Sequence, residues 1–484
     1  MICFLSSVNL AEKASAFTMI LCFVLPLFCL IFVCFFFARN GSRSRLFGFF
    51  LWAASFLLKS GFALAIHTRP ESDFHLLYSA AQNLAGGGGN LGALPYFQYW
   101  PYQSAFAAWM AFFIRWFGAD VVFFKLMNCL FSASSTLLVY LLAKRFASER
   151  GARAAAVLFL IYPGTFLLIP VLTNQHLSEF LVLLAVYLFT APAKQRKGRL
   201  AKSAAASAFL ALSNAIRPMG ILMIAAVAGL TVMQIISPRK DRKAKREAFA
   251  SAFLFAALFF LITFSLSGLA KAAGLNEYGL GNSVPQWKFI LGFNAQSIGQ
   301  YSAQDAKTVF GGGFHPDAAD RLLRQRLSIR PLAFLNLAFQ KAKIMWGSFE
   351  PTFWAFTGNV CAEIGTPGSV FSLTRVLRNV CKFTAGLYIW SNLLIALGAI
   401  SPFREKRENR THELLMLAAL AYFFALSVIE IQTRYRSLMT ALTFPLAAAG
   451  LDLLWGTWQS FRRHGRREAV LTERETACRP IPFA

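Results

Sequence analysis

Ionisable side chains at residues 71–75 are the first place in this chain where catalytic chemistry can be sought. Glu71, Asp73 and His75 occupy every second position. A positioned carboxylate can accept the proton of an attacking hydroxyl, a role that typically contributes about 10²–10⁴ to a rate. Loop carboxylates are usually only solvated, but the chain holds just 22 acidic residues. Asp73 is therefore the candidate general base, with Glu71 and His75 as candidate assisting groups.

A second group of polar side chains interrupts an apolar stretch at residues 173–179. The simplest interpretation is a polar turn between two helices. Such a density of polar groups at a membrane boundary also suits a rim that binds a sugar. In that interpretation Glu179 supports Asp73 or binds a sugar hydroxyl, and His176 is a further contact. The polar positions are Thr173, Asn174, Gln175, His176, Ser178 and Glu179.

Charged residues also lie between apolar segments, at Arg217 and from Glu430 to Arg436. A charge at the bilayer centre costs about 2.5–3.5 kcal/mol on insertion scales, so such residues pair, face a cavity or reach the interface. Glu430 and Arg434 are spaced to pair with each other if a helix continues through them. In the functional alternative, Arg217, Arg434 or Arg436 binds a phosphate through two parallel hydrogen bonds.

Two lysines occupy an otherwise apolar stretch, Ser328–Trp346. This stretch is predicted to form a helix at the membrane interface. Lys341 and Lys343 would then either bind a substrate phosphate or contact lipid headgroups.

Composition identifies the elements that must position these residues. The chain is 57% hydrophobic and 14% charged, which is typical of an integral membrane protein. Its net charge of +26 is concentrated in short basic runs that are predicted to be cytoplasmic. No platform of basic and aromatic residues accompanies these runs, which argues against nucleic-acid binding. The runs are Arg39 to Arg45, Lys144 to Arg153, Lys194 to Lys202, Arg239 to Arg246, Arg404 to Arg410 and Arg462 to Arg474.

Hydropathy predicts an all-α fold with about eleven transmembrane helices. When the basic runs lie inside, these segments alternate without contradiction, with the N-terminus outside and the C-terminus inside. The predicted spans are Phe17–Phe37, Leu46–Ile66, Val121–Ala143, Ala154–Pro170, Leu177–Ala191, Ser203–Ile216, Met219–Ile236, Ala248–Gly268, Val380–Ile400, Glu413–Glu430 and Leu438–Leu454.

This topology predicts two large extracytoplasmic regions, at about residues 67–120 and 269–379. No Lys or Arg occurs from Pro70 to Ile114, which supports an outer location for Asp73. Amphipathic spacing predicts an interfacial helix over Asp73–Ala85 that includes Tyr78. The aromatic-rich stretch Pro101–Phe117 is predicted to form another, because a span there would put the Lys144 to Arg153 run outside. Residues 46–456 would form one membrane domain, after an extra N-terminal span and cytoplasmic loop at 1–45 and before a basic cytoplasmic tail at 457–484.

Cysteines and short motifs give few further indications. Cys361 lies in the second outer region and Cys381 at the start of the next predicted span, so both could face outward, and the sequence does not decide whether they pair. Neither a phosphate-binding loop nor a dinucleotide-binding motif occurs, and no metalloprotease or serine hydrolase motif occurs either.

With these residues located, the chain resembles the GT-C glycosyltransferases. The likeness is greatest to the bacterial family-39 proteins related to protein O-mannosyltransferases and to the aminoarabinose transferase that modifies lipid A. It covers most of the chain from about Leu46. The elements that carry it are Ser72-Asp73-Phe74-His75 with Tyr78 and Ala81, the stretch Pro101 to Gly118, Tyr162-Pro163 leading to Thr173 and Glu179, Ile216-Arg217-Pro218, Leu291-Gly292-Phe293-Asn294 with Ser297, Gly299 and Asp305, Pro331 with Lys341 and Trp346, and Glu430 with Arg434-Tyr435 and Pro445.

The resemblance implies inverting transfer of a hexose or pentose from a polyprenyl-phosphate donor to an acceptor at the outer face of the inner membrane. It implies Asp73 as the base, and Arg217, Lys341, Arg434 and Tyr435 as donor phosphate-binding residues. The acceptor would be a protein, a glycan or a lipid of the cell envelope. One departure is that the nearest second acidic residue, Glu71, lies two positions before Asp73, which leaves a divalent metal undecided.

A polytopic transporter or a flippase for lipid-linked glycans is the alternative. Many spans and intramembrane charges suit such a protein. The sequence contains no inverted repeat, however, and the candidate functional groups fall at one membrane face instead of the midplane.

Overall fold

The structure is a computed structural model that describes residues 24–25, 27–28, 32, 44–65, 68–162, 164–347, 386–387, 389–401 and 409–477. Every regular element in these ranges is helical, as predicted. The predicted first span lies almost wholly outside the described residues, as do residues 348–379 of the second outer region. Cys361 and Cys381 also lie outside them.

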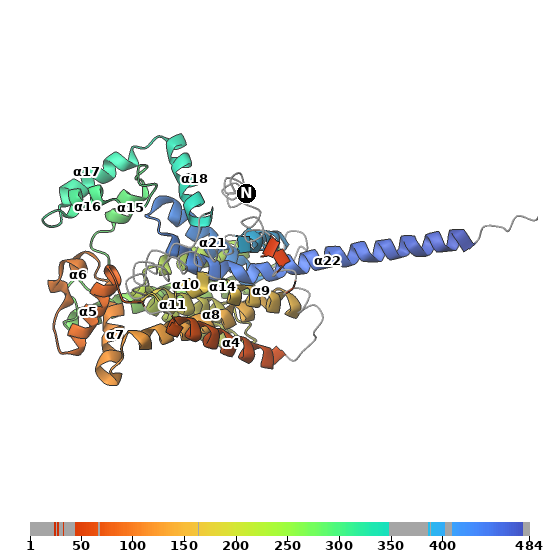
Figure 1. Cartoon of the computed structure of the whole chain (residues 1–484), viewed down its shortest axis with the longest axis horizontal. Helices are drawn as coiled ribbons and strands as arrows, with labels where there is room; N and C mark the ends of the chain where they lie inside the picture. Colours follow the sequence, from red (N-terminus) through yellow and green to blue (C-terminus); the bar gives the residue numbers. More distant parts are fainter. Residues whose placement is uncertain are drawn as a thin grey trace, which may run out of the picture.

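The helices fall into a bundle and two smaller groups at one end of it (Figure 1). In chain order the elements are α4 (Ser44–Ala65), α5 (Asp73–Ala85), η2 (Leu91–Ala93), α6 (Pro95–Tyr99), α7 (Gln103–Phe117), α8 (Val121–Ala143), α9 (Glu149–Ile161), α10 (Gly164–Leu167), α11 (Gln175–Phe189), α12 (Arg196–Ile216), α13 (Gly220–Ile236), α14 (Arg242–Ala272), α15 (Gln286–Gly292), α16 (Ala303–Phe310), α17 (Pro316–Leu327), α18 (Pro331–Gly347), α21 (Arg410–Val428), η3 (Thr433–Tyr435) and α22 (Arg436–Ala477).

Five described helices are long and apolar enough to cross a membrane: α4, α8, α14, α21 and the first part of α22. Shorter apolar helices cover 175–189, 220–236 and 389–401. This architecture fits an integral membrane protein, whereas the expected total of eleven spans stays a prediction.

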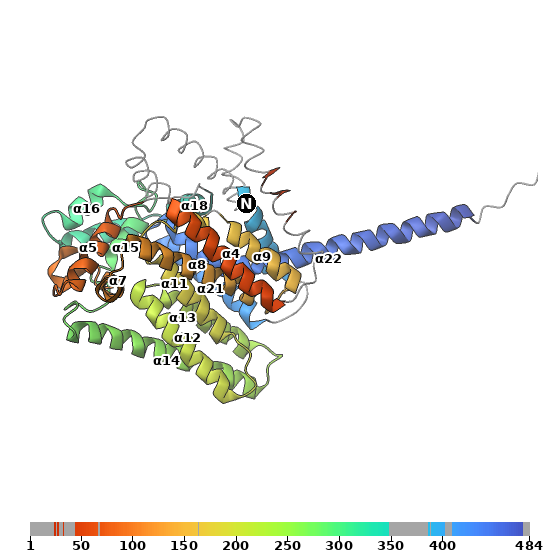
Figure 2. The ribbon, with the colours of Figure 1, turned by 60° about the horizontal axis from the view of Figure 1, so that its bottom comes forward.

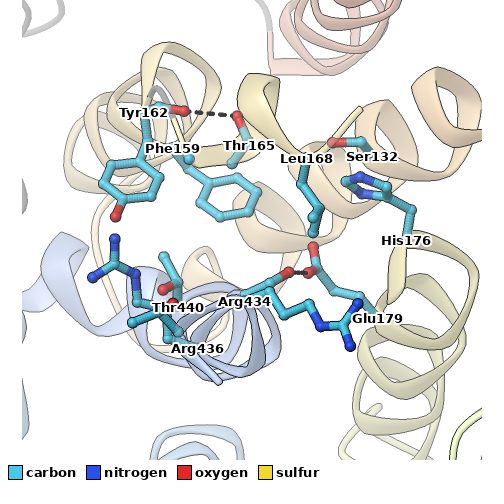
Figure 3. Close-up of a pocket in the computed structure, with 13 residues that line it drawn as sticks. Ser132, Phe159, Tyr162, Thr165, Leu168, His176, Glu179, Arg434, Arg436 and Thr440 are labelled. Carbon is cyan, nitrogen blue, oxygen red and sulfur yellow. Dashed lines mark hydrogen bonds between the residues drawn. The ribbon is translucent and has the colours of Figure 1, made fainter. Parts of the chain in front are cut away.

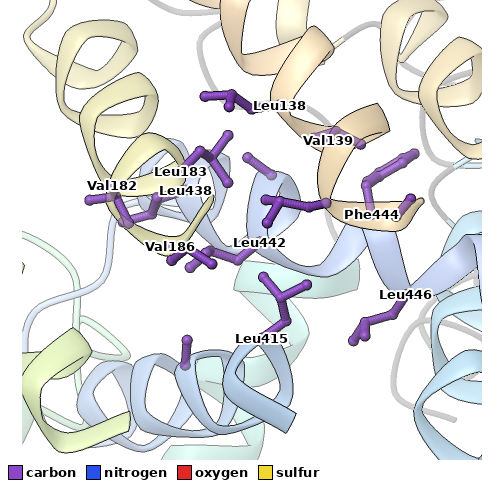
Figure 4. Packing of buried hydrophobic residues seen from close by; sticks show 14 of the residues in the cluster. Leu138, Val139, Val182, Leu183, Val186, Leu415, Leu438, Leu442, Phe444 and Leu446 are labelled. Atoms are coloured by element: carbon purple, nitrogen blue, oxygen red, sulfur yellow. The ribbon is translucent and has the colours of Figure 1, made fainter. Parts of the chain in front are cut away.

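The centre of the bundle is formed by α8, α9, α11, α21 and α22, whose buried Leu, Val and Phe side chains interdigitate (Figure 4). Small residues let these helices approach closely, as is usual between membrane helices. Gly151 of α9 is an example, because a Cβ there would lie 2.6 Å from the carbonyl oxygen of Ala448 in α22. Helices α12, α13 and α14 lie along one side of this centre (Figure 2).

Hydrogen bonds and ion pairs join the helix ends that carry the basic runs. Arg145 Nη1 after α8 donates to Thr190 Oγ1 at the end of α11 at 2.5 Å, and Asn409 Nδ2 before α21 donates to the Arg145 carbonyl at 2.9 Å. Arg199 and Glu247 pair at 2.9 Å between the starts of α12 and α14. The two groups α5–α7 and α15–α18 lie toward the opposite helix ends (Figure 1).

Helices form at the three places where interfacial helices were predicted: α5 has the predicted bounds, and α7 and α18 begin two to three residues late. Helix α5 buries Phe74, Leu77, Ala80 and Ala81 and packs on α7. The second outer region is joined to the first by backbone hydrogen bonds, because Tyr102 N donates to the Gly281 carbonyl at 3.0 Å. The two predicted outer regions therefore form one layer.

One predicted span was wrong in detail. The span expected over Ala154–Pro170 is broken, since α9 ends at Ile161 and only the short α10 follows. Tyr162 has extended backbone angles, which is the preference of a residue before a proline. Helix α22 continues to Ala477, so the predicted tail from residue 457 begins within a helix, and the predicted domain bounds stay predictions.

Candidate active site

A cavity of about 350 Å³ lies where the two outer groups meet the bundle. Its wall is built by the start of α5, the α6–α7 connection, the α12–α13 turn, α15 and the segment between α21 and α22. The lining residues are Asp73, Tyr96, Trp100, Tyr102, Gln103, Asn174, Arg217, Pro218, Met219, Asn282, Trp287, Lys288, Tyr301, Leu426, Ile429, Glu430, Gln432, Arg434 and Tyr435.

Asp73 is the first residue of α5 and contributes a carboxylate to this cavity. A helix N-terminus favours negative charge because its first N–H groups have no partner within the helix. Ser72 before it has φ of 49°, a left-handed angle that is uncommon for a residue with a side chain. The side chain of Asp73 is exposed, while the next residue, Phe74, is buried and anchors the helix. The carboxylate is thus presented to the cavity from a fixed helix end.

Two of the arginines expected to bind phosphate line the same cavity. Arg217, in the turn between α12 and α13, donates from Nη1 to Asn174 Oδ1 at 3.2 Å, and its guanidinium lies 4.8 Å from the Tyr435 ring centre. Arg434 Nε donates to Gln432 Oε1 at 2.6 Å, and its guanidinium lies 5.1 Å from the ring centre of Phe74. Aromatic faces hold both guanidinium planes while leaving several N–H groups for a ligand.

Lys288 of α15 is a third cation in the cavity and was not predicted from the sequence. It forms a short ion pair with Glu430, whose side chain is 3% exposed. Burial alone would lower the pKa of Lys288, but Tyr435 and Glu430 beside it raise that pKa well above its ordinary value. A usable signal existed, because Lys288 is the single basic residue between Lys271 and Lys307 in a predicted outer region.

The predicted partner of Glu430 was wrong. Helix α21 ends at Val428, so Glu430 and Arg434 do not lie one helical turn apart. Glu430 pairs with Lys288 instead and accepts a hydrogen bond from Gln432 Nε2 at 3.0 Å. Burial would raise the pKa of Glu430, but the positive Lys288 and these hydrogen bonds outweigh it and hold the pKa below its ordinary value.

Three other residues predicted near Asp73 do not line the cavity. Glu71 and His75 are exposed, and the ring of His75 lies 3.4 Å from Ser79 Oγ on the same helix. Tyr78 packs edge to face against Phe124, with ring centres 6.3 Å apart. Their roles as assisting groups stay predictions, and of these four residues Asp73 is the one that lines the cavity.

The expected sugar-binding rim at residues 173–179 is buried, not exposed. Only Asn174 of its six polar residues lines the main cavity. His176 and Glu179 instead face a second cavity of about 20 Å³, which is room for a single water (Figure 3). Glu179 accepts a hydrogen bond from Ser437 Oγ at 2.5 Å. Arg434 lines both cavities, whereas Glu179 lines only the small one and Asp73 only the main one.

Lys341 lies outside the lining of the main cavity. It is 1% exposed, and its Nζ donates to backbone carbonyls of three residues around the α21 end. Among the described residues, no group of three or more His, Cys, Asp or Glu side chains is placed to hold a metal ion.

Comparison with known proteins gives little. The chain matches no protein-family model and no curated protein. Among solved structures it is similar to the oligosaccharyltransferase of Archaeoglobus fulgidus in the apo form, at 14% identity and a TM-score of 0.49 over 86% of this chain and 52% of that one. The same enzyme with an inhibitory peptide and a dolichol-phosphate gives 13% identity and a TM-score of 0.46 over the same shares. The chain therefore spans about half the length of these structures, and the likeness assigns neither family nor substrate.

Proposed function

We propose that this protein is a membrane glycosyltransferase of the GT-C type that transfers a sugar from a polyprenyl-phosphate donor to an acceptor outside the cytoplasm. The observation that carries the proposal is that a carboxylate, Asp73, and three cations, Arg217, Lys288 and Arg434, line one cavity. These residues come from four separate elements and are distant in the sequence, so only the fold brings them together.

The arrangement suits an inverting displacement. The acceptor hydroxyl attacks the anomeric carbon of the sugar, and Asp73 takes the hydroxyl proton as the new glycosidic bond forms. The bond from that carbon to the phosphate oxygen breaks, and the phosphate keeps the electron pair. Negative charge then increases on the leaving phosphate, where the guanidinium groups of Arg217 and Arg434 would stabilise it. Lys288 is the third cation of the lining, although its ion-pair partner Glu430 offsets part of its positive charge.

The proposal also places the active site on one side of the membrane. The helix ends that carry basic runs gather away from the cavity, and basic residues collect in cytoplasmic loops. This supports an active site on the outer face of the inner membrane. Donor and acceptor would then meet on the side where lipid-linked sugars are used for the cell envelope.

The test is sugar transfer, or slow hydrolysis of the donor, by the purified protein in lipid nanodiscs with a panel of radiolabelled polyprenyl-phosphate sugars. Asp73→Asn should lower kcat by about 10²–10⁴ while donor binding persists, because only proton transfer is removed. Glu277→Gln, an exposed carboxylate outside the cavity lining, is the matched control and should keep parental turnover.

Other outcomes separate the alternatives. Turnover that survives in Asp73→Asn would remove Asp73 from the mechanism but keep the enzyme class. A folded protein without turnover on any donor, which moves lipid or solute across vesicle membranes, would establish the transporter instead.

A further inference from the structure

Two segments that carry site residues are paired through their backbones. The segment from α15 to Gly299 holds Lys288, and the segment after α21 holds Glu430. Glu430 N donates to the Lys288 carbonyl at 2.8 Å, and Ile431 N donates to the Gly299 carbonyl at 2.8 Å. We call this pairing the clasp. The ion pair between Lys288 and Glu430 depends on its geometry, because both residues belong to it.

Lys341 of α18 is inserted at the centre of the clasp. Its Nζ donates to the carbonyls of Gly292 at 3.1 Å, Ser427 at 2.9 Å and Ile429 at 2.7 Å. A protonated lysine has three N–H groups, so these carbonyls engage all of them. The last carbonyls of a helix have no partner within it and favour a nearby cation, which suits Ser427 in the final turn of α21. No donor is left over for a substrate phosphate.

The backbone around Lys341 leaves no room for larger residues. A Cβ at Gly292 would lie 2.2 Å from the Val428 carbonyl oxygen. Gly299 has φ of +75°, and a Cβ there would lie 2.7 Å from Cε of Lys341. The side chain of Lys341 is thus enclosed by the two segments that it joins.

We propose that Lys341 is a positioning residue, which holds Lys288 and Glu430 at the cavity by binding the carbonyls of Gly292, Ser427 and Ile429. This differs from the phosphate-binding role expected from the sequence. The proposal about the clasp stands by itself, and only its kinetic test below rests on the proposed function.

The direct test is hydrogen exchange of the Glu430 and Ile431 amides, which donate the two hydrogen bonds of the clasp. In Lys341→Met in nanodiscs, exchange at these amides should be at least about tenfold faster, while α8 and α11 keep parental protection. Lys343→Met is the matched control, because Lys343 lies on the same helix over the Phe339 ring and should change nothing at the clasp. Parental protection at both amides in folded Lys341→Met would overturn the proposal.

A second variant covers the case in which Lys341→Met does not fold. Gly299→Ala keeps Lys341 but places a methyl group against its side chain and disfavours the backbone angle. It should loosen the same two amides. Loss of protection throughout the bundle in both variants would also overturn the proposal, since Lys341 would then be a general stabilising residue.

The kinetic test uses a double-mutant cycle. If Lys341 acts through Lys288, its substitution has no further effect once Lys288 is gone. The double variant, Lys288→Met with Lys341→Met, should then have the same kcat/KM for the sugar donor as Lys288→Met alone. Multiplied losses would show that Lys341 contacts the donor itself and would overturn the positioning role. If no donor is used at all, the proposed function fails, while the exchange result still decides the clasp.

Discussion

At the scale of single residues, the buried carboxylate of Glu430 depends on a charged partner for its stability. Its pairing with Lys288 holds its pKa below the ordinary value despite burial. Glu430→Gln should therefore lower the free energy of unfolding at neutral pH by roughly 1–3 kcal/mol, because a charged hydrogen-bond partner is lost. The measurement is thermal unfolding of the purified protein in detergent.

The pH profile of this difference has a definite sign. A carboxyl group with a depressed folded-state pKa stabilises fully above its unfolded value, near 4.3, and the contribution is lost as pH falls through the folded-state value. The gap between parent and Glu430→Gln should therefore close below about pH 4. Asp320→Asn, exposed on α17, should show no comparable gap. A gap that widens in acid would contradict the assigned pairing.

Sequence located some site residues well and others not at all. Asp73 was accessible because charge bias and helix spacing are local signals, and the structure places it at the start of α5 in the cavity. The ion pair between Lys288 and Glu430 joins residues 142 positions apart. Its prediction required the end of α21 at Val428, whereas an unbroken helix would pair Glu430 with Arg434.

At the scale of elements, the helix at 389–401 crosses α22 with backbones in contact. A Cβ at Gly450 would lie 2.1 Å from the Leu394 carbonyl oxygen, and one at Gly398 would lie 1.8 Å from that of Leu446. Gly450→Ala should lower the free energy of unfolding by about 1–3 kcal/mol, because the helices must separate. Thermal unfolding in detergent measures the change.

Gly456 on α22 supplies the control, because alanine there should not lower the free energy of unfolding. A Cβ there meets nothing within 4 Å. Gly456→Ala should be neutral or stabilising by up to about 1 kcal/mol, since alanine restricts the unfolded chain and favours helix. Equal effects of the two substitutions would show that the crossing is not as close as described.

Element boundaries followed from sequence wherever a local rule dominates. The bounds of α5 and α8 were predicted to the residue, because amphipathic spacing in α5 and an unbroken apolar run in α8 define them. The start of α9 was predicted five residues late because Glu149, Arg150 and Arg153 indicate a loop by composition, although packing buries Arg153. Long-range packing of this kind leaves no trace in a hydropathy profile.

At the scale of the whole molecule, the arrangement predicts which surfaces face each side of the membrane. Cysteine introduced at Gly89, an exposed position after α5 where a Cβ meets nothing within 4 Å, should react with a membrane-impermeant maleimide in intact cells. Cysteine introduced at Lys240, before α14, should react only after permeabilisation, because its basic run belongs on the cytoplasmic side. Labelling is compared with the parent, which retains its own cysteines. The reverse pattern would place the cavity on the cytoplasmic face.

The segment from Leu426 to Tyr435 contributes the last part of the cavity wall, and this has a consequence for timing during synthesis. Asp73 and Arg217 leave the ribosome long before that segment. The nascent chain can insert helix after helix while its carboxylate and its first cation have no common pocket. If the proposed function holds, transferase activity therefore appears only once this segment has been made and has packed against the rest of the cavity wall.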